Sequence, residues 1–335
     1  MFGQQLETSA SIVNPDPNVR AENYENERFV NAAIGVFGTT NKMNLFPLEF
    51  LMAKYIPWYK TTMFKKLQSD WDIVREVGLK KMYDFIERYD NDELDEMEKK
   101  SYLAGAIKRQ RETEEVTQDE MVELCLIALF VGVDTTSSVT SWNVMHLALN
   151  EDVQEKLYKE LSASVKENGG TLSAAVLEKK ASPYLHMCLR ESHRATPAFT
   201  AAMWKGNSHK DVEIHGQTIP KGNMFQMGHI SFDEDYVNDP FEFRPERWDT
   251  EGVASRKGTK SEVLDHPFLR DPFSQGARRC PGSRVAQNEI LAMISRLVLD
   301  WKISVPDDNI KSLKDIKHDE SPIKPIFPQI KFEAR

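Results

Sequence analysis

The feature that most constrains the fold of this chain is the stretch at positions 273–282, Phe-Ser-Gln-Gly-Ala-Arg-Arg-Cys-Pro-Gly. Apolar residues recur at helical spacing directly after it, which predicts a long helix over 283–301. Cys280 therefore lies at a helix entrance, where backbone N–H groups and the helix dipole stabilise a thiolate. Arg278 and Arg279 place further positive charge beside it. The stretch indicates either a thiolate ligand for a soft metal ion or a buried structural cysteine.

A haem iron is held by one cysteine thiolate in one large class of enzymes. The residues of fixed spacing in this stretch are Phe273, Gly276, Arg278, Cys280 and Gly282. With this spacing the stretch resembles the haem-binding loop of the cytochrome P-450 family, F-x-x-G-x-R-x-C-x-G. The resemblance implies that Cys280 is the metal ligand, an axial thiolate to the iron of haem b. It also implies that the other four residues form the cofactor-binding loop.

Composition excludes several other classes of protein. The chain has 335 residues, 40% of them hydrophobic, and a net charge of -9 without a dense basic block, so we expect no nucleic-acid partner. Its three cysteines lie far apart and form no C-x-x-C, which argues against a zinc site or a disulfide framework and fits a reducing compartment. No apolar run reaches the ~18 residues of a spanning helix. The longest, 124–131, predicts part of a buried helix.

A second motif lies within that predicted helix. Thr117 and Glu120 form a capping-box pattern, which predicts a helix from 117 to about 149. Its middle contains Gly132, Asp134 and Thr135, which are poor residues for a buried helix. This pattern indicates either a kink rich in Thr and Ser or a resemblance to the family's oxygen-binding helix, (A/G)-G-x-(D/E)-T.

The resemblance assigns a role to each residue of this second motif. Gly132 would let haem and oxygen approach the backbone and so belongs to the cofactor-binding set. The Thr135 hydroxyl would hydrogen-bond dioxygen, and Asp134 would relay protons, so these two are the predicted catalytic residues. Val131 stands where the family has a smaller residue.

Two further motifs stand in the order that the family has. Ser182-Pro183 opens a predicted helix that carries Glu191 and Arg194 on one face. These residues resemble the family's E-x-x-R pair, which links to an arginine in a later meander. Pro-Glu-Arg-Trp at 245–248 supplies that meander with Arg247. The resemblance implies a structural role for all three charged residues, and four motifs in order make coincidence negligible.

The remaining sequence predicts a mainly α fold with small β segments. The resemblance implies a single partial cytochrome P-450 domain over 1–335 that lacks the N-terminal part of the fold. A charged stretch at 90–115 predicts a solvated helix or linker. The predicted helices are 21–36, 64–89 and 151–166, and the predicted β segment is 212–228. Residues 322–327 resemble the family's final hairpin, so we expect the chain to be complete at its C-terminus.

The chain also departs from the family pattern. The family's W-x-x-x-R motif is spelled at 71–75, but too close to the oxygen-binding helix, so we interpret this match as chance. Trp204 stands where the family has a propionate-binding arginine, and the neighbouring Lys205 offers only a point charge. The family lines its substrate pocket with residues that correspond here to 197–203 and 321–322, both mostly apolar.

The resemblance implies a haem-thiolate monooxygenase that inserts one oxygen atom from O2 into a lipophilic substrate such as a sterol, fatty acid or other lipid-like molecule. The 134–136 motif and the Pro-x-Lys-Pro-Ile ending are most similar to the mitochondrial type, whose electron donor is a small acidic ferredoxin. Arg190, Arg279 and Arg284 would then form a basic proximal patch. A flavin reductase is the alternative donor.

We expect membrane association, in mitochondria rather than the endoplasmic reticulum, with the targeting segment absent from this chain. The competing hypothesis is a truncated, non-catalytic helical protein similar to a cytochrome P-450. The sequence specifies neither the substrate nor its site of oxidation.

Overall fold

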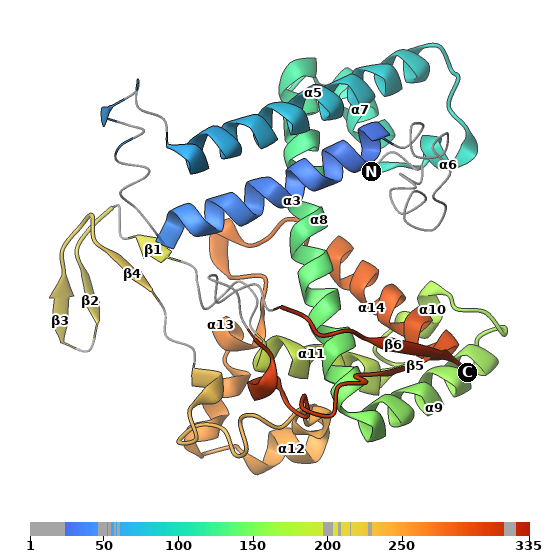
Figure 1. The fold of residues 1–335 in the computed structure, drawn as a ribbon, viewed down its shortest axis with the longest axis vertical. Coiled ribbons are helices and arrows are strands. Elements are labelled where there is room, and N and C mark those ends of the chain that lie inside the picture. Colours follow the sequence, from blue (N-terminus) through green and yellow to red (C-terminus); the bar gives the residue numbers. More distant parts are fainter. Residues whose placement is uncertain are drawn as a thin grey trace. The chain divides into compact units, whose positions relative to one another are not determined.

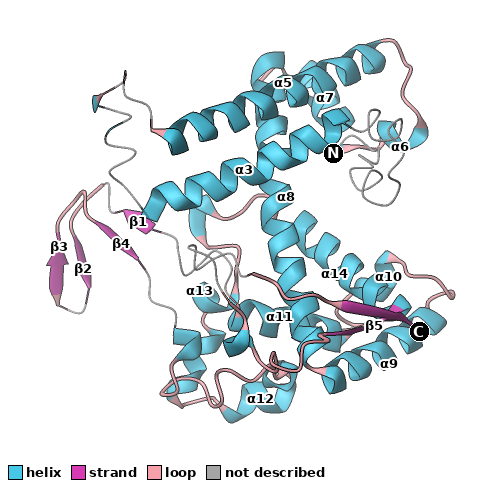
Figure 2. Cartoon of the chain, in the orientation of Figure 1, coloured by secondary structure: helices cyan, strands magenta, loops and turns pink. Residues whose placement is uncertain are grey.

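The computed structural model describes residues 24–45, 52, 55, 56, 58, 61–196, 204–206, 209–214, 216–226, 230–317 and 326–335. The chain divides into two compact units, Met1–Thr135 and Thr136–Arg335, each with its own hydrophobic core. The described part is mainly helical, with three small two-stranded sheets (Figures 1 and 2). This confirms the predicted fold class. That the two units together form one domain stays a prediction.

The regular elements that the structure describes in the first unit are all helices. Its elements are α3 (Tyr24–Leu45), α5 (Thr62–Asp90), α6 (Glu96–Lys99), α7 (Tyr102–Thr113) and the first half of α8 (Gln118–Leu149). Thr61 caps α5 by accepting a hydrogen bond from the Phe64 N–H at 3.2 Å, which fixes where that helix begins. Helices α3 and α5 lie side by side (Figure 1). The largest fully buried side chains of this core are Met82, Leu103, Ile107 and Leu126.

The segment 90–115 forms two helices, α6 and α7, which confirms the helix alternative of the prediction, but one face of these helices is buried and not solvated. Asp95 caps α6, and Glu98 behind it is fully buried and accepts two hydrogen bonds from Arg88, both at 2.7 Å. Leu103 and Ile107 of α7 pack into the core at i, i+4 spacing. The high charge of the segment obscured this narrow apolar face, because acids and bases occupy most of the positions before and after it.

Helix α8 begins as the sequence predicts. The Thr117 N–H donates to Glu120 Oε2 at 2.8 Å, and the Glu120 N–H donates to Thr117 Oγ1 at 3.2 Å, which completes a capping box. The helix then runs unbroken through its polar middle. Side-chain hydroxyls there bond back to carbonyl oxygens one turn earlier, as Thr140 Oγ1 does to the Thr136 carbonyl at 2.9 Å. These bonds satisfy the hydroxyls within the helix.

The apolar run 124–131 is buried on only one side, which corrects the expectation of a buried segment. Leu126 is fully buried, whereas Leu124 is 60% exposed and Ile127 45% exposed. Among the described helices, α8 is long and apolar enough to cross a membrane by length and composition. Core helices of soluble proteins share this length and composition, and 33% of the most apolar window of α8 is buried.

The second unit combines helices with short strands. Its α-helices after α8 are α9 (Glu151–Glu167), α10 (Ala174–Leu177), α11 (Pro183–Ala195), α12 (Thr250–Ser255), α13 (Pro267–Arg270) and α14 (Ser283–Asp300). Its 3-10 turns are η2 (Ile230–Phe232), η3 (Pro245–Trp248), η4 (Lys260–Asp265), η5 (Gly276–Arg278) and η6 (Leu313–Asp315). The antiparallel strand pairs are β1 (Trp204–Gly206) with β4 (Met224–Gln226), β2 (Val212–Ile214) with β3 (Gln217–Ile219), and β5 (Trp301–Ser304) with β6 (Lys331–Ala334).

Helices α9, α11 and α14 enclose the core of the second unit. A buried amide ties this core to the last sheet: Gln154 Nε2 donates to the Ile303 carbonyl at 2.8 Å, and its Oε1 accepts from the Ile303 N–H at 2.9 Å. The predicted final hairpin at 322–327 falls largely on 318–325, outside the described residues. The last described strand is β6. The fully buried side chains at the centre include Leu147, Leu157, Leu161, Leu185, Ile290 and Ile303.

Candidate functional site

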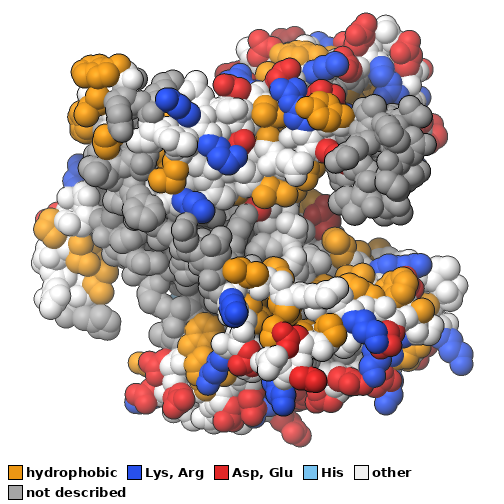
Figure 3. Space-filling view, in the orientation of Figure 1, with side chains coloured by type: hydrophobic (Ala, Val, Ile, Leu, Met, Phe, Trp, Pro, Cys, Tyr) orange, Lys and Arg blue, Asp and Glu red, His pale blue; other side chains and the backbone are white. Residues whose placement is uncertain are grey.

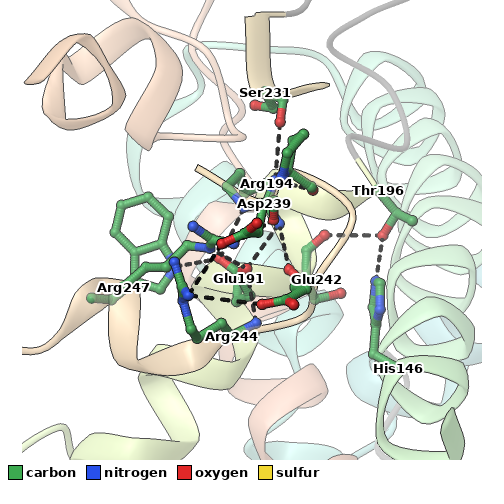
Figure 4. Close-up of polar contacts among 12 residues, drawn as sticks. His146, Glu191, Arg194, Thr196, Ser231, Asp239, Glu242, Arg244 and Arg247 are labelled. Atoms are coloured by element: carbon green, nitrogen blue, oxygen red, sulfur yellow. Dashed lines mark hydrogen bonds and ion pairs between the residues drawn. The ribbon is translucent and has the colours of Figure 1, made fainter. Parts of the chain in front are cut away.

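Glu191 is the centre of a buried charge network in the second unit. Proline at the first position of α11 starts the helix, and the three-residue spacing then places Glu191 and Arg194 on one face. The Glu191 side chain is fully buried. Its two oxygens accept five hydrogen bonds, which come from Arg194 Nε and Nη2, Arg247 Nε, Trp248 Nε1 and the backbone N–H of Arg244 (Figure 4). A buried carboxylate needs such saturation.

The two arginines also hold the meander by its backbone. Arg194 Nη1 donates to the carbonyls of Ser231 (3.0 Å) and Pro240 (2.8 Å), and its Nη2 donates to that of Glu242 (3.1 Å). The Arg247 guanidinium donates to the carbonyls of Asn238 and Asp239. The three predicted structural residues therefore connect α11 to residues 231–248, with Glu191 as the acceptor and the two multi-donor guanidiniums of Arg194 and Arg247 as donors.

Trp248 carries a second cluster that sequence reasoning missed. The guanidiniums of Arg190 and Arg256 lie 3.8 Å and 4.8 Å from its ring centroid. Asp265 bridges both arginines, accepting from Arg190 Nη2 at 3.0 Å and from Arg256 Nε at 2.8 Å. These arginines hold the pKa of the Asp265 carboxyl below its ordinary value despite partial burial. Arg190 is thus not a free charge of the predicted basic patch.

His146 of α8 was likewise missed. Its ring is fully buried, stacks on Phe243 at 4.4 Å, and lies with Nε2 3.1 Å from Thr196 Oγ1. Because the Thr196 hydroxyl donates to the Ser192 carbonyl, His146 Nε2 carries the proton in this contact. Burial, reinforced by the Arg194 charge, lowers the pKa of His146 to about 3, so the ring is neutral. Its position one turn before the end of α8 carries no motif.

The loop around Cys280 has a tightly turned backbone. The Cys280 N–H donates to the Phe273 carbonyl at 2.9 Å, and the Arg279 N–H donates to the Gly276 carbonyl at 3.1 Å. Ser274 and Gly276 adopt left-handed φ values of 66° and 79°. An added Cβ on Gly276 would meet nothing within 4 Å, so glycine is favoured there by its conformation and not by space.

Asp271 organises the entrance to this loop. Its carboxylate accepts from the Phe273 N–H at 3.0 Å and from Gln275 Nε2 at 2.8 Å, and it pairs with Arg279 Nη2 at 3.1 Å. The signal for this role was an acid two residues before the loop, the spacing of an Asx turn. Arg278, predicted as cofactor-binding, is exposed.

The three thiols of the chain differ in accessibility. Cys125 and Cys188 are buried, and burial raises the pKa of both. Cys280 is partly exposed and lies three residues before the start of α14, with Gly282 as the capping residue. An added Cβ on Gly282 would lie 3.9 Å from the Cys280 sulfur. The described residues contain no cluster of three or more His, Cys, Asp or Glu side chains able to hold a metal ion. A cofactor that takes a single thiolate ligand from the protein fits the one partly exposed thiol, Cys280.

The residues of the predicted oxygen-binding motif belong to the first unit. Gly132 is exposed, and an added Cβ would meet nothing within 4 Å. Asp134 is buried, and the Thr135 hydroxyl donates to the Val131 carbonyl at 2.9 Å. The structure therefore gathers the predicted residues into three groups. They are the network of Glu191, Arg194 and Arg247, the loop of Phe273, Gly276, Arg278, Cys280 and Gly282, and the α8 motif of Gly132, Asp134 and Thr135.

Other residues that the sequence singled out have ordinary surroundings. Trp71 packs edge-on against Phe130 at 5.3 Å, and Arg75 pairs with Glu123 on the surface, so the Trp-x-x-x-Arg match serves packing and surface charge. Lys205 lies in β1 with Trp204. The predicted pocket-lining stretches 197–203 and 321–322 lie outside the described residues.

A mainly helical fold, a partly exposed thiol before a helix start and a buried Glu–Arg–Arg network are the features that the sequence resemblance implied. The family model described as Cytochrome P450 matches residues 18–330. The chain belongs to the cytochrome P450 family, as the sequence motifs predicted.

Similar proteins come from two flies and from human. "Cytochrome P450 CYP12A2" of Musca domestica is 32% identical over 280 residues, which are 78% of this chain and 48% of that protein. "Probable cytochrome P450 12a5, mitochondrial" of Drosophila melanogaster is 28% identical over 73% of this chain and 45% of that protein. "Cytochrome P450 3A5" of Homo sapiens is 36% identical over 52% of this chain and 32% of that protein. The chain thus spans less than half the length of these relatives.

Proposed function

We propose that the chain carries the haem-thiolate centre of a monooxygenase that inserts one oxygen atom from O2 into a lipophilic substrate, a sterol, fatty acid or other lipid-like molecule. The observation that carries this proposal is Cys280, the partly exposed thiol in a turned loop directly before α14. Haem b, when bound, supplies the iron at which dioxygen is activated.

We assign the binding of that cofactor to the Cys280 loop. The Cys280 sulfur would hold the iron, and the left-handed turn at Gly276 lets the loop present it at the helix start. Arg278, exposed beside it, offers a guanidinium to a carboxylate of the cofactor. The Glu191 network would keep α11 and the meander fixed behind the loop without taking part in chemistry.

We assign proton delivery to α8. The Thr135 hydroxyl donates to the Val131 carbonyl at 2.9 Å, which leaves its oxygen able to accept a hydrogen bond from a second donor. Asp134, buried on the neighbouring position, would supply the proton. The exposed Gly132 would leave room for the reacting groups at the helix surface.

We propose a small acidic ferredoxin as electron donor, with membrane association in mitochondria, because two of the relatives quoted are of the 12a type and one is named mitochondrial. Arg284 is exposed at the start of α14, whereas Arg190 and Arg279 pair with Asp265 and Asp271. Acidic and basic side chains are interspersed on the visible surface (Figure 3). A flavin reductase is the alternative donor.

The test is the reduced, CO-treated absorption spectrum of the purified chain reconstituted with haem. We expect the Soret band of a haem thiolate, its loss in Cys280→Ala, and its retention in Cys125→Ala and Cys188→Ala. An unchanged band in Cys280→Ala would refute the ligand assignment. A chain that folds but takes up no haem would favour the second candidate, a non-catalytic helical protein, which the short coverage of the relatives motivates.

A further inference from the structure

Asp271 holds three residues of the Cys280 loop with one carboxylate. Its Oδ1 accepts a hydrogen bond from the Phe273 N–H at 3.0 Å, and its Oδ2 accepts one from Gln275 Nε2 at 2.8 Å and lies 3.1 Å from Arg279 Nη2. The Asp271 side chain is only 17% exposed, so solvent screens these contacts less than on an open surface. The carboxylate therefore closes the loop from its first residue to the residue before the thiol.

The contact with Phe273 extends to Cys280 through the backbone. The Phe273 carbonyl accepts a hydrogen bond from the Cys280 N–H at 2.9 Å. The Phe273 ring lies edge-on to His193 of α11, with centroids 6.2 Å apart and an interplanar angle of 73°. Phe273 is thus held at its N–H, its carbonyl and its ring, and the position of the Cys280 backbone depends on it.

Ser274 has a backbone conformation that needs support from its neighbours. Its φ is 66°, in the left-handed region, which is unfavourable for a residue that carries a Cβ. Such a residue persists where the surrounding structure fixes it. Asp271 fixes the residue on each side of Ser274, Phe273 by its N–H and Gln275 by its side-chain amide. The strained turn before the thiol is therefore held by a carboxylate that precedes it.

We propose that Asp271 is a positioning residue for Cys280, which holds the loop in one conformation before any cofactor binds and so presents the sulfur ahead of α14. Asp271 lies outside the stretch 273–282 whose spacing defines the sequence motif, and it acts on Cys280 through Phe273 and Arg279. The inference rests on the proposed function only for the identity of the group that the sulfur then binds.

The test measures the loop in the apoprotein of the full chain. The two readouts are the rate at which iodoacetamide alkylates Cys280, located by peptide mass spectrometry, and the rate of deuterium uptake over 273–280. Asp271→Ala should raise both rates about tenfold, the factor that corresponds to losing one charge-assisted hydrogen bond. Asp271→Asn keeps an oxygen that can accept from the Phe273 N–H but cannot pair with Arg279, so its rise should be smaller.

Asp307→Ala is the matched control, because Asp307 makes the same kind of turn outside the loop. Its Oδ1 accepts a hydrogen bond from the N–H of Asn309, two residues further on, at 3.0 Å, as Asp271 does from Phe273. Asp307 is exposed, and its replacement should leave both rates at Cys280 unchanged. Unchanged rates in Asp271→Ala, or an equal rise in Asp307→Ala, would overturn the proposal.

If urea unfolding shows that Asp271→Ala does not fold, Asp271→Asn and Arg279→Gln take its place. Each removes the ion pair across the loop, and unchanged rates in both would equally overturn the proposal.

The haem-loaded protein supplies a spectroscopic readout that a purely structural role would not change. Asp271→Ala should lower the fraction of bound haem that shows the thiolate Soret band, with partial recovery in Asp271→Asn and no change in Asp307→Ala. An unchanged fraction in Asp271→Ala would count against positioning of the sulfur. Persistence of the thiolate band in Cys280→Ala would instead refute the proposed function, and the effect of Asp271 on the apoprotein would still stand.

Discussion

Removal of the Glu191 carboxylate is the sharpest test of the buried network. Glu191→Ala deletes the acceptor of five hydrogen bonds and leaves the guanidiniums of Arg194 and Arg247 without their counterion in a fully buried site. Breaking one buried ion pair costs ~3–5 kcal/mol. Because two arginines lose the same partner, we expect a loss of about 5 kcal/mol or more in the free energy of unfolding. That equals the whole stability of many domains, ~5–15 kcal/mol.

The assay is urea unfolding followed by far-ultraviolet circular dichroism. Glu191→Ala should lack a cooperative transition for the second unit, and Glu191→Gln, which keeps the shape and one acceptor oxygen, should lose less. Glu251→Ala is the matched control, because that side chain is exposed in the first turn of α12 and its removal should stay within ~0.5 kcal/mol. A Glu191→Ala chain that unfolds at the same urea midpoint as the unsubstituted protein would refute the reasoning.

Three further predictions concern single positions in the chain. His146 and His193 have folded-state pKa values of about 3 and about 4, below the ordinary 6.5, so the unfolded chain binds protons that the folded chain excludes. The free energy of unfolding should have its full value above pH 6.5 and should fall as the pH drops toward 4, by up to ~1.4 kcal/mol per pH unit for each histidine. Urea midpoints at several pH values measure this fall. Gly252→Ala places a Cβ 2.5 Å from a backbone carbonyl oxygen of η3, so it should lower the free energy of unfolding by ~1–3 kcal/mol. Gly105→Ala, whose Cβ would meet nothing within 4 Å in helix α7, should raise it by up to ~1 kcal/mol in the same assay. Thr135→Ala should lower the amount of product formed per electron consumed in a full-length protein, while haem binding is retained. An unchanged ratio would refute a catalytic role for Thr135.

The sequence was sufficient for the elements whose signal is local. The capping box at Thr117 predicted the start of α8, and helical periodicity over 64–89 predicted α5 to within two residues. The Cys280 loop and the Glu191–Arg194 pair were found because each is spelled by a few residues at short spacing. Family membership followed from these local patterns.

The partnerships between distant residues were not predictable in the same way. Arg194 binds backbone carbonyls of residues 231–242, and a carbonyl leaves no trace in the sequence. Asp265 bridges two arginines around Trp248 through tertiary folding alone. His146 became conspicuous only through its burial, since a lone histidine in a helix has no distinctive pattern.

The three thiols differ enough in burial that alkylation can measure how much of the protein has bound its cofactor. Alkylating reagents attack the thiolate, so the buried Cys125 and Cys188, with pKa values raised by burial, should react slowly, while the partly exposed Cys280 is open to the reagent. Iodoacetamide should therefore label the folded apoprotein once per chain, at residue 280. Haem uptake would protect the same sulfur, and the labelled fraction, read by intact mass, then counts the molecules that lack cofactor.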